Sequence, residues 1–430
     1  MQRDRLDALA HQAVVFERSY QGSFPTIPTR TDMFTGRYVF PLRGWSPIPR
    51  EDKVLAEFLT EAGYATMLIA DTYHLFRDGS YFDRGFEAWD WIRGQEIDRF
   101  KRDDIPVRFP CAPEKTKRPW MMEAYLKNVA GRRGEADHFV AQVATHAIDW
   151  LDRNHRRQPF FLWIDSFDPH EPWDPPRWCT ELYGPGYAGE ELIFPPYREV
   201  GFCSDAELKH IAALYCGEVT LVDKWLGLLL QHIEELGLYA ETVVIFMSDH
   251  GYLHGEHGRV GKSNHNLEAD GWPFYQEISR QVLMVRGPGV IGGVRNASLV
   301  QSVDLFPTIL ELAGIPLPPG VHGRSWAPAL QGATVGAPRV AVTSWALREI
   351  AKPLRYASIT DGAWSLEYPG GEGPSELYDL TRDHGQQHNV IRAHGETARE
   401  FHARYVEMLR AISTAPARLA LQTPTPVIQG

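Results

Sequence analysis

The sequence predicts an α/β fold in which a mainly parallel central sheet is flanked by helices, followed by a small α+β subdomain. Up to about residue 335, short β-branched and apolar runs alternate with amphipathic helical segments, the pattern of a parallel sheet covered on both faces. Beyond that point, three short strand candidates are followed by one helix. We therefore expect an α/β domain over residues 1–335 and an α+β subdomain with a flexible tail over residues 336–430.

Hydrophobic periodicity places the individual elements in order along the chain. Residues 4–16 are amphipathic and predict a first helix, and a proline- and threonine-rich turn follows at residues 24–30. Residues 71–119 have no clear period and are expected to form loops. Further helices are expected at residues 53–62, 136–155, 205–236, 304–313 and 396–412, and strands at residues 65–70, 160–164, 242–247, 282–285, 340–344, 356–360 and 364–367.

Composition excludes several functional classes. The 430 residues are 43% hydrophobic and 23% charged, as in a globular protein with a large core. A formal net charge of −11 argues against a nucleic-acid or anionic-membrane surface, and no apolar run approaches the roughly 18 residues of a membrane span. The polar start of the chain does not resemble a signal peptide, so we expect a cytoplasmic protein with no nucleic-acid or membrane partner, and a homo-oligomer stays open. Four cysteines without a close pair predict reduced, buried thiols: Cys111, Cys179, Cys203 and Cys216.

The most informative segment begins where the apolar run of residues 242–247 ends. Asp249 and His250 follow this run directly, and in open α/β sheets active sites gather at such strand ends. The loop that comes next carries four more basic side chains: His254, His257, Lys262 and His265. Oxygen and nitrogen ligands beside a cationic loop suit a divalent metal and an anionic substrate. The alternative is that these residues form only a turn, with Gly251 allowing a positive φ.

The segment from Thr26 to Arg37 predicts a short helix with a hydroxyl at its amino terminus. Pro28 favours a helix start, and Gly36 can end the helix after about two turns. At a helix amino terminus, free N–H groups and the helix dipole stabilise phosphate or sulfate, and Arg30 adds a forked donor for the same oxygens. The alternative is that a threonine caps the helix and Arg30 is a solvated surface charge.

In their order along the chain, these segments resemble the sulfatase family of the alkaline-phosphatase-like superfamily. In that family a Cys-or-Ser-x-Pro-x-Arg segment followed by Thr-Gly-Arg carries the nucleophile. Residues 26–30 and Thr35-Gly36-Arg37 lie in register with it. Other matching stretches cover nearly the whole chain: Glu61-Ala62-Gly63-Tyr64, Phe167-Asp168-Pro169-His170-Glu171-Pro172, Tyr215-Cys216-Gly217-Glu218-Val219, Gly258-Arg259-Val260-Gly261-Lys262, Val303-Asp304-Leu305-Phe306-Pro307-Thr308, Gly323-Arg324-Ser325 and Glu376-Leu377-Tyr378-Asp379-Leu380. The resemblance implies an alkaline-phosphatase-like fold and a metal-dependent hydrolase of sulfate or phosphate esters.

The chain departs from the family pattern in three places. Thr26 stands where sulfatases convert Cys or Ser to formylglycine, and threonine cannot form that aldehyde. The family's first strand, with its metal-binding aspartates, is expected before residue 1. Asp71-Thr72-Tyr73-His74 keeps the histidine of the family's Lys-x-His but not its lysine. Either a segment upstream of Met1 is missing, or the protein is a catalytically inactive, sulfatase-like one.

The resemblance implies roles for the residues that meet the transferred group. A divalent metal ion (Ca²⁺, Mg²⁺, Mn²⁺ or Zn²⁺) would be held by Asp249 and His250, and histidine at the latter position favours manganese or zinc over calcium. The metal would activate Thr26 for attack on the sulfur or phosphorus of a small anionic ester. Arg30 and Lys262 would stabilise charge on the oxygens of that group.

The resemblance also implies a proton donor. His170 would protonate the leaving alcohol or orient the ester, with His74 or His257 as alternatives, and His257 is further expected to bind substrate. Because Thr26 carries a plain hydroxyl, a phosphodiesterase or phosphonate monoester hydrolase is an alternative to a sulfate-ester hydrolase.

Overall fold

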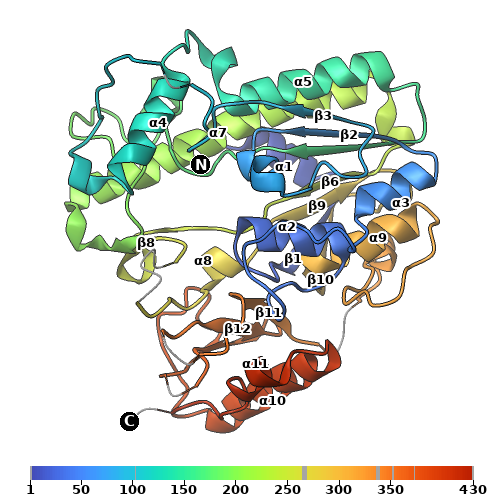
Figure 1. Cartoon of the computed structure of the whole chain (residues 1–430), viewed down its shortest axis with the longest axis vertical. Coiled ribbons are helices and arrows are strands. Elements are labelled where there is room, and N and C mark those ends of the chain that lie inside the picture. Colours follow the sequence, from blue (N-terminus) through green and yellow to red (C-terminus); the bar gives the residue numbers. More distant parts are fainter. Residues whose placement is uncertain are drawn as a thin grey trace. The chain divides into compact units, whose positions relative to one another are not determined.

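The structure, a computed structural model, describes residues 2–101, 103–263, 269–335, 339–350, 353–371 and 373–428 (Figure 1). His265 of the predicted histidine-rich loop lies outside these residues. Contacts between Cα atoms divide the chain into two units. Unit 1 comprises Met1–His11, Ala56–Thr242 and His254–Gly261, and unit 2 comprises Gln12–Leu55, Val243–Leu253 and Lys262–Gly430. The domain division expected at residue 335 stays a prediction.

Unit 1 is built on a three-stranded parallel sheet with the strand order β3-β2-β4, formed by Ala88–Trp91, Ala65–Ala70 and Phe160–Asp165. All six residues of β2 are buried, as its uninterrupted apolar sequence predicts. Helix α5 (Phe139–Asn154) packs against β2, β4 and the long helix α7 (Asp205–Glu235), and Figure 1 shows α5 and α7 side by side.

The other elements of unit 1 are short. They are α1 (Asp4–Ala10), α3 (Leu55–Glu61), α4 (Pro119–Val129), α6 (Arg177–Glu181), β5 (Arg198–Glu199), β8 (Arg259–Gly261) and the 3₁₀ helices η1 (Tyr73–Leu75), η2 (Arg77–Gly79), η3 (Pro113–Lys115), η4 (Glu135–Asp137), η5 (Val200–Phe202), η6 (Leu238–Ala240) and η7 (Glu256–Gly258). Hydrogen bonds connect α1 to α7: the carboxylate of Asp223 in α7 accepts from the backbone N–H groups of Arg5 and Leu6 in α1. Within the described part of the chain, no helix is both long and apolar enough to cross a membrane.

Unit 2 contains a mixed sheet with the strand order β10-β1-β9-β6. Strand β1 (Val14–Tyr20) pairs in parallel with β10 (Val294–Gln301) and antiparallel with β9 (Leu283–Arg286), which pairs antiparallel with β6 (Val244–Met247). The helical elements of this part are α2 (Thr26–Thr35), α8 (Gln276–Ser279), η8 (Ser302–Asp304), α9 (Leu305–Leu312) and η9 (Ala327–Gln331), and β7 (Leu253–His254) spans the boundary to unit 1.

The C-terminal part of unit 2 is a four-stranded antiparallel sheet followed by a helix. Its strands are β11 (Ala341–Ser344), β12 (Ala357–Thr360), β13 (Trp364–Tyr368) and β14 (Glu376–Asp379), and α10 (Gly395–Ala411) packs on β12 and β13. A buried cluster that includes Val342, Ile359, Leu366, Phe401 and Leu409 joins sheet and helix. The tail contains α11 (Pro416–Ala420), after which Gln422 accepts a hydrogen bond from Tyr405.

In unit 2 the structure corrects three expectations. The helix predicted over residues 4–16 ends at Ala10, and β1 begins at Val14; its pairing with two neighbours favours the extended state for Val14 and Val15. Strand β10 lies where no element was predicted. Strand β9 departs from the mainly parallel pairing expected for the sheet, because it is antiparallel to both of its neighbours, β1 and β6. The described residues between β6 and β9 form β7, η7, β8 and the four-residue helix α8, and none of these is long enough for the helical crossover that usually joins a parallel pair.

In unit 1 the excursion over residues 71–119 is not loop throughout. It contains β3, which pairs with β2 at the edge of the parallel sheet, and α4 begins at its end. A four-residue edge strand has too few residues to produce a clear period, so only its pairing identifies it. The remaining predicted helices and strands are confirmed to within a few residues. The four cysteines are free, as expected, but only Cys111 and Cys179 are buried.

Candidate active site

In unit 2 the strand end at residue 248 is shaped by a glycine. Gly251 follows Asp249 and His250, and its N–H donates to the carbonyl oxygen of Ile278. A Cβ at position 251 would lie 1.9 Å from the carbonyl oxygen of Glu277. Only glycine permits so close an approach, so this residue sets the course of the chain directly after the two candidate metal ligands.

Thr26 is the first residue of α2, as the sequence predicted for a hydroxyl at a helix amino terminus. The preceding turn is held by Asp32, which accepts hydrogen bonds from the backbone N–H and hydroxyl of Ser23 and from the N–H of Val39. Burial raises the pKa of Asp32 to about 7, although these hydrogen bonds oppose the rise. Gly36 ends the helix in the left-handed conformation, with φ 66°.

Five of the predicted site residues converge in unit 2. The hydroxyl oxygen of Thr26 lies 3.4 Å from Nε2 of His250, and Nη1 of Arg30 donates to Oδ2 of Asp249 at 2.6 Å. Nζ of Lys262 lies 3.0 Å from the same Nε2. Thr26, Arg30 and Lys262 are 2%, 7% and 7% exposed, so these polar groups meet in a largely buried environment.

The charges of this cluster are set by burial and by its cations. Burial alone would raise the pKa of Asp249, but His250, Arg30 and Lys262 outweigh it and hold that pKa well below the ordinary value. Burial lowers the pKa of His250 to about 4, against the attraction of Asp249. At neutral pH, Asp249 is therefore a carboxylate and His250 a neutral imidazole.

The hydrogen bonds of His250 identify its tautomer. Nδ1 lies 3.1 Å from the carbonyl oxygen of Gly251, an acceptor only, so Nδ1 carries the proton. The lone pair of Nε2 then accepts from Lys262 and faces the hydroxyl of Thr26. A carboxylate, a neutral imidazole nitrogen and a hydroxyl are donors that fit a divalent metal. These residues provide three ligand atoms, whereas such ions take four to six ligands or more. The described residues of this cluster therefore supply part of a coordination shell.

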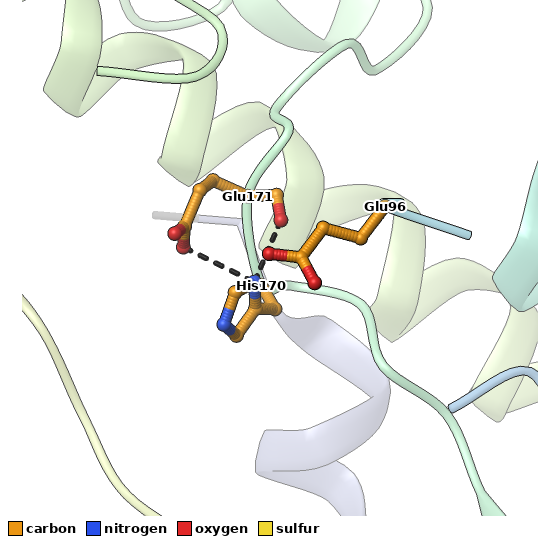
Figure 2. Close-up of side chains that lie close together, drawn as sticks. All are labelled: Glu96, His170 and Glu171. Carbon is orange, nitrogen blue, oxygen red and sulfur yellow. Dashed lines mark hydrogen bonds and ion pairs between the residues drawn. The ribbon is translucent and has the colours of Figure 1, made fainter. Parts of the chain in front are cut away.

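A second polar cluster lies in unit 1 and contains two of the predicted histidines, His74 and His170; Figure 2 shows His170 with Glu96 and Glu171. Nδ1 of His170 lies 2.6 Å from the carbonyl oxygen of Glu171 and 3.1 Å from its Oε2. Nε2 of His74 lies 3.4 Å from Oε2 of Glu96. Lys117 forms ion pairs with both glutamates, at 3.0 Å to Glu171 and 3.5 Å to Glu96. Glu96 and Lys117 were not predicted, because both lie in the excursion whose sequence has no periodicity or motif.

His257 lies in η7 of unit 1, in a left-handed backbone conformation with φ 54°. The neighbouring His254 packs its ring against Tyr215 and Trp173, with ring centroids 4.1 Å and 5.3 Å apart. Burial lowers the pKa of His254 to about 3, so it is a neutral, packed side chain. The substrate-binding role of His257 stays a prediction.

Comparison with known proteins gives a consistent result. Residues 2–315 match the family model described as Sulfatase, and residues 269–411 match that described as N-sulphoglucosamine sulphohydrolase, C-terminal. Arylsulfatase K of Bos taurus is 25% identical over 345 residues, which cover 73% of this chain and 58% of that protein. Choline-sulfatase of Rhizobium meliloti (strain 1021) is 24% identical over 417 residues, covering 88% and 75% of the two chains.

Solved structures share the fold. The phosphonate monoester hydrolase of Agrobacterium radiobacter superposes with a TM-score of 0.72 at 22% identity, over 95% of this chain and 91% of that one. A protein solved in complex with its substrate D-glucosamine-2-N,6-O-disulfate superposes with a TM-score of 0.70 at 18% identity, over 96% and 92% of the two chains. The predicted alkaline-phosphatase-like α/β fold is thereby confirmed.

Proposed function

Because this chain belongs to the sulfatase family of hydrolases, we propose that it hydrolyses small sulfate esters at the cluster around Thr26. One observation carries the proposal: the hydroxyl of Thr26, the carboxylate of Asp249 and the imidazole of His250 meet beside the cations of Arg30 and Lys262. A nucleophile, oxygen and nitrogen metal donors, and two cations in one buried place are what transfer of an anionic group requires.

Each residue of this cluster has a distinct task in the proposed reaction. Oγ1 of Thr26 forms a bond to sulfur while the bond between sulfur and the alcohol oxygen breaks, and water then hydrolyses the threonyl sulfate. Arg30 and Lys262 bind the sulfate oxygens and stabilise the charge that develops on them. Asp249 and His250, with Thr26, would hold a divalent metal. When bound, that metal would supply the positive charge that stabilises the threonine alkoxide after its proton has passed to solvent.

We further propose that His170 gives its proton to the leaving alcohol, with His74 as the alternative. The proposal is supported by the family motif and by the contacts of Nδ1 with the carbonyl oxygen and carboxylate of Glu171, which orient the imidazole. The expected cytoplasmic location and the oligomeric state stay predictions, to be tested by cell fractionation and by light scattering.

A second candidate function is hydrolysis of phosphodiesters or phosphonate monoesters. One observation favours it: residue 26 is threonine, whose hydroxyl attacks phosphorus directly without the conversion to formylglycine that sulfatases use. The third candidate, a catalytically inactive protein, predicts neither turnover nor stoichiometric metal.

Assays with 4-nitrophenyl sulfate and bis(4-nitrophenyl) phosphate separate these candidates. Each would be run with Mn²⁺, Zn²⁺, Mg²⁺ and Ca²⁺, on the wild type, Thr26→Ala and Thr26→Ser. We expect Thr26→Ala to lose at least a hundredfold in kcat and Thr26→Ser to retain measurable activity. Thr31→Ala is the matched control, because that hydroxyl donates within α2 to the carbonyl oxygen of Ile27. Turnover that is unchanged in Thr26→Ala would refute the assignment of the nucleophile.

A further inference from the structure

We propose that Glu96, Lys117 and Glu171 form a buried positioning network for the imidazoles of His74 and His170. In this network Lys117 is the internal cation that holds both glutamates in place. The inference rests on the proposed function only in giving His170 the part of proton donor. It adds three residues to which neither the family motifs nor the sequence assign a role.

In each glutamate of the network, one carboxylate oxygen faces Lys117 and the other faces a histidine. Nζ of Lys117 lies 3.0 Å from Oε1 of Glu171 and 3.5 Å from Oε1 of Glu96. The other oxygen of each glutamate faces a histidine: Oε2 of Glu171 is 3.1 Å from Nδ1 of His170, and Oε2 of Glu96 is 3.4 Å from Nε2 of His74. Each glutamate thus connects the ammonium group to one imidazole.

Aromatic and hydroxyl groups hold Lys117 itself in place. Its ammonium group lies 3.2 Å from the hydroxyl of Tyr197 and 4.2 Å and 4.9 Å from the ring centroids of Tyr197 and Phe194. Tyr197 also donates a short hydrogen bond to Oε1 of Glu171. The side chain of Lys117 is 7% exposed, so its charge is directed to the two glutamates rather than to water.

Charge balance explains why a lysine is needed here. The side chains of Glu96 and Glu171 are 6% and 0% exposed, and two buried carboxylates without a cation would be strongly disfavoured. Burial alone would raise the pKa of Glu96, but Lys117, His74 and His170 hold it well below the ordinary value. Glu96 can therefore stay charged beside His74. The carboxylate of Glu171 lies beside Nδ1 of His170, while the backbone carbonyl oxygen of the same glutamate accepts the hydrogen bond that orients this ring.

The same residues could be taken for a metal site. Ligand atoms of Glu96, His170 and Glu171 all lie within 4.8 Å of one another. Figure 2 shows the three side chains close together. Lys117, however, already brings a positive charge within 3.5 Å of both carboxylates, and a metal ion would have to displace it. The geometry therefore assigns the cation of this cluster to the protein itself.

Leaving-group dependence tests this network, because general acid catalysis matters most for poor leaving groups. The full chain and the variants Glu171→Gln, Lys117→Met and Lys117→Arg would be assayed on 4-nitrophenyl sulfate and phenyl sulfate. We expect Glu171→Gln and Lys117→Met to lose ten- to a hundredfold in kcat on phenyl sulfate and less than threefold on 4-nitrophenyl sulfate. Lys117→Arg should recover most of the loss. Equal losses on both esters would overturn the proposal.

The pH profile supplies a readout that a purely structural role would not change. The charged groups that face His170 are Glu171 and, further away, Glu96 and Lys117. Removing a negative charge in Glu171→Gln should move the basic limb of the kcat/KM profile to lower pH, and removing the positive charge in Lys117→Met should move it to higher pH. Shifts in the same direction would contradict the network. Lys115→Met is the matched control, because Lys115 pairs with Glu190 and Glu207 instead.

Two further measurements separate failure of this inference from failure of the proposed function. If His170→Gln itself shows no leaving-group dependence, the proton donor was wrongly assigned. The ring ¹⁵N shifts of His170, followed as a function of pH, then decide the network, because the midpoint of imidazole protonation should fall in Glu171→Gln and rise in Lys117→Met. Unchanged midpoints, or stoichiometric Mn²⁺ or Zn²⁺ that Glu96→Gln alone removes, would overturn the inference. If Lys117→Met does not fold, Glu171→Gln and Lys117→Arg carry the test.

Discussion

We expect His254 to make the protein sensitive to moderate acid. Its ring lies against Tyr215 and Trp173 in unit 1, and burial lowers its pKa to about 3, only partly opposed by the charge of Glu171. In the unfolded chain the same histidine titrates at about 6.5. Between these two values the unfolded state binds a proton that the folded state does not.

The sign and size of the effect follow from this difference in pKa. Because the unfolded state binds more protons, the free energy of unfolding falls as the pH decreases through 6.5, and the fall continues until the folded state is protonated near pH 3. At pH 5 the unfolded state gains RT ln(1 + 10^1.5) relative to alkaline pH, about 2 kcal/mol from this one residue.

Urea unfolding of the full chain at pH 7.5 and pH 5.0 measures this contribution. We expect His254→Gln to lose about 2 kcal/mol less than the wild type between the two pH values. His384→Gln is the matched control, because that side chain is exposed and its replacement should leave the difference unchanged. If His254→Gln shows the same acid-induced loss as the wild type, burial of a neutral imidazole is not the cause.

Three further predictions concern the cluster in unit 2. Gly251→Ala places a Cβ 1.9 Å from the carbonyl oxygen of Glu277 and should lower the stability measured by thermal unfolding by about 1–3 kcal/mol. Gly134→Ala is the control and should not lower it, because no atom lies within 4 Å of a Cβ at that position. Equal effects of the two substitutions would contradict the close-approach argument. Arg30→Met breaks the 2.6 Å ion pair with Asp249 and should lower the free energy of unfolding by about 2 kcal/mol. The same substitution should raise KM, and an unchanged KM would exclude Arg30 from substrate binding. Mn²⁺ or Zn²⁺ at a hundredfold excess over Kd should stabilise the wild type by about 2.7 kcal/mol, and Asp249→Asn should remove this stabilisation. If the metal stabilises the wild type and Asp249→Asn equally, it binds elsewhere.

The sequence alone could predict most of the elements, because local contacts determine them. The apolar residues of α7 recur with helical spacing, and the uninterrupted run of β2 marks a buried strand. The turn at Gly251 and the end of α2 at Gly36 were also visible, because each depends on one glycine. Gly36 adopts a positive φ, whereas Gly251 has no positive φ and is required because it lacks a Cβ. The strands β1 and β10 were not visible, because pairing with partners distant in sequence stabilises them more than their own pattern does.

For the candidate site, the sequence determined which chemical groups are available, and the tertiary structure decided which of them meet. The motifs identified Thr26, Asp249 and His250 as candidates, but the 3.4 Å approach of Thr26 to His250 joins residues 224 positions apart and depends on the folding of unit 2. Glu96 and Lys117 had no local signal at all, because an ion pair leaves no periodicity in the sequence. Their importance arises from burial, which makes every charge in the interior require a partner.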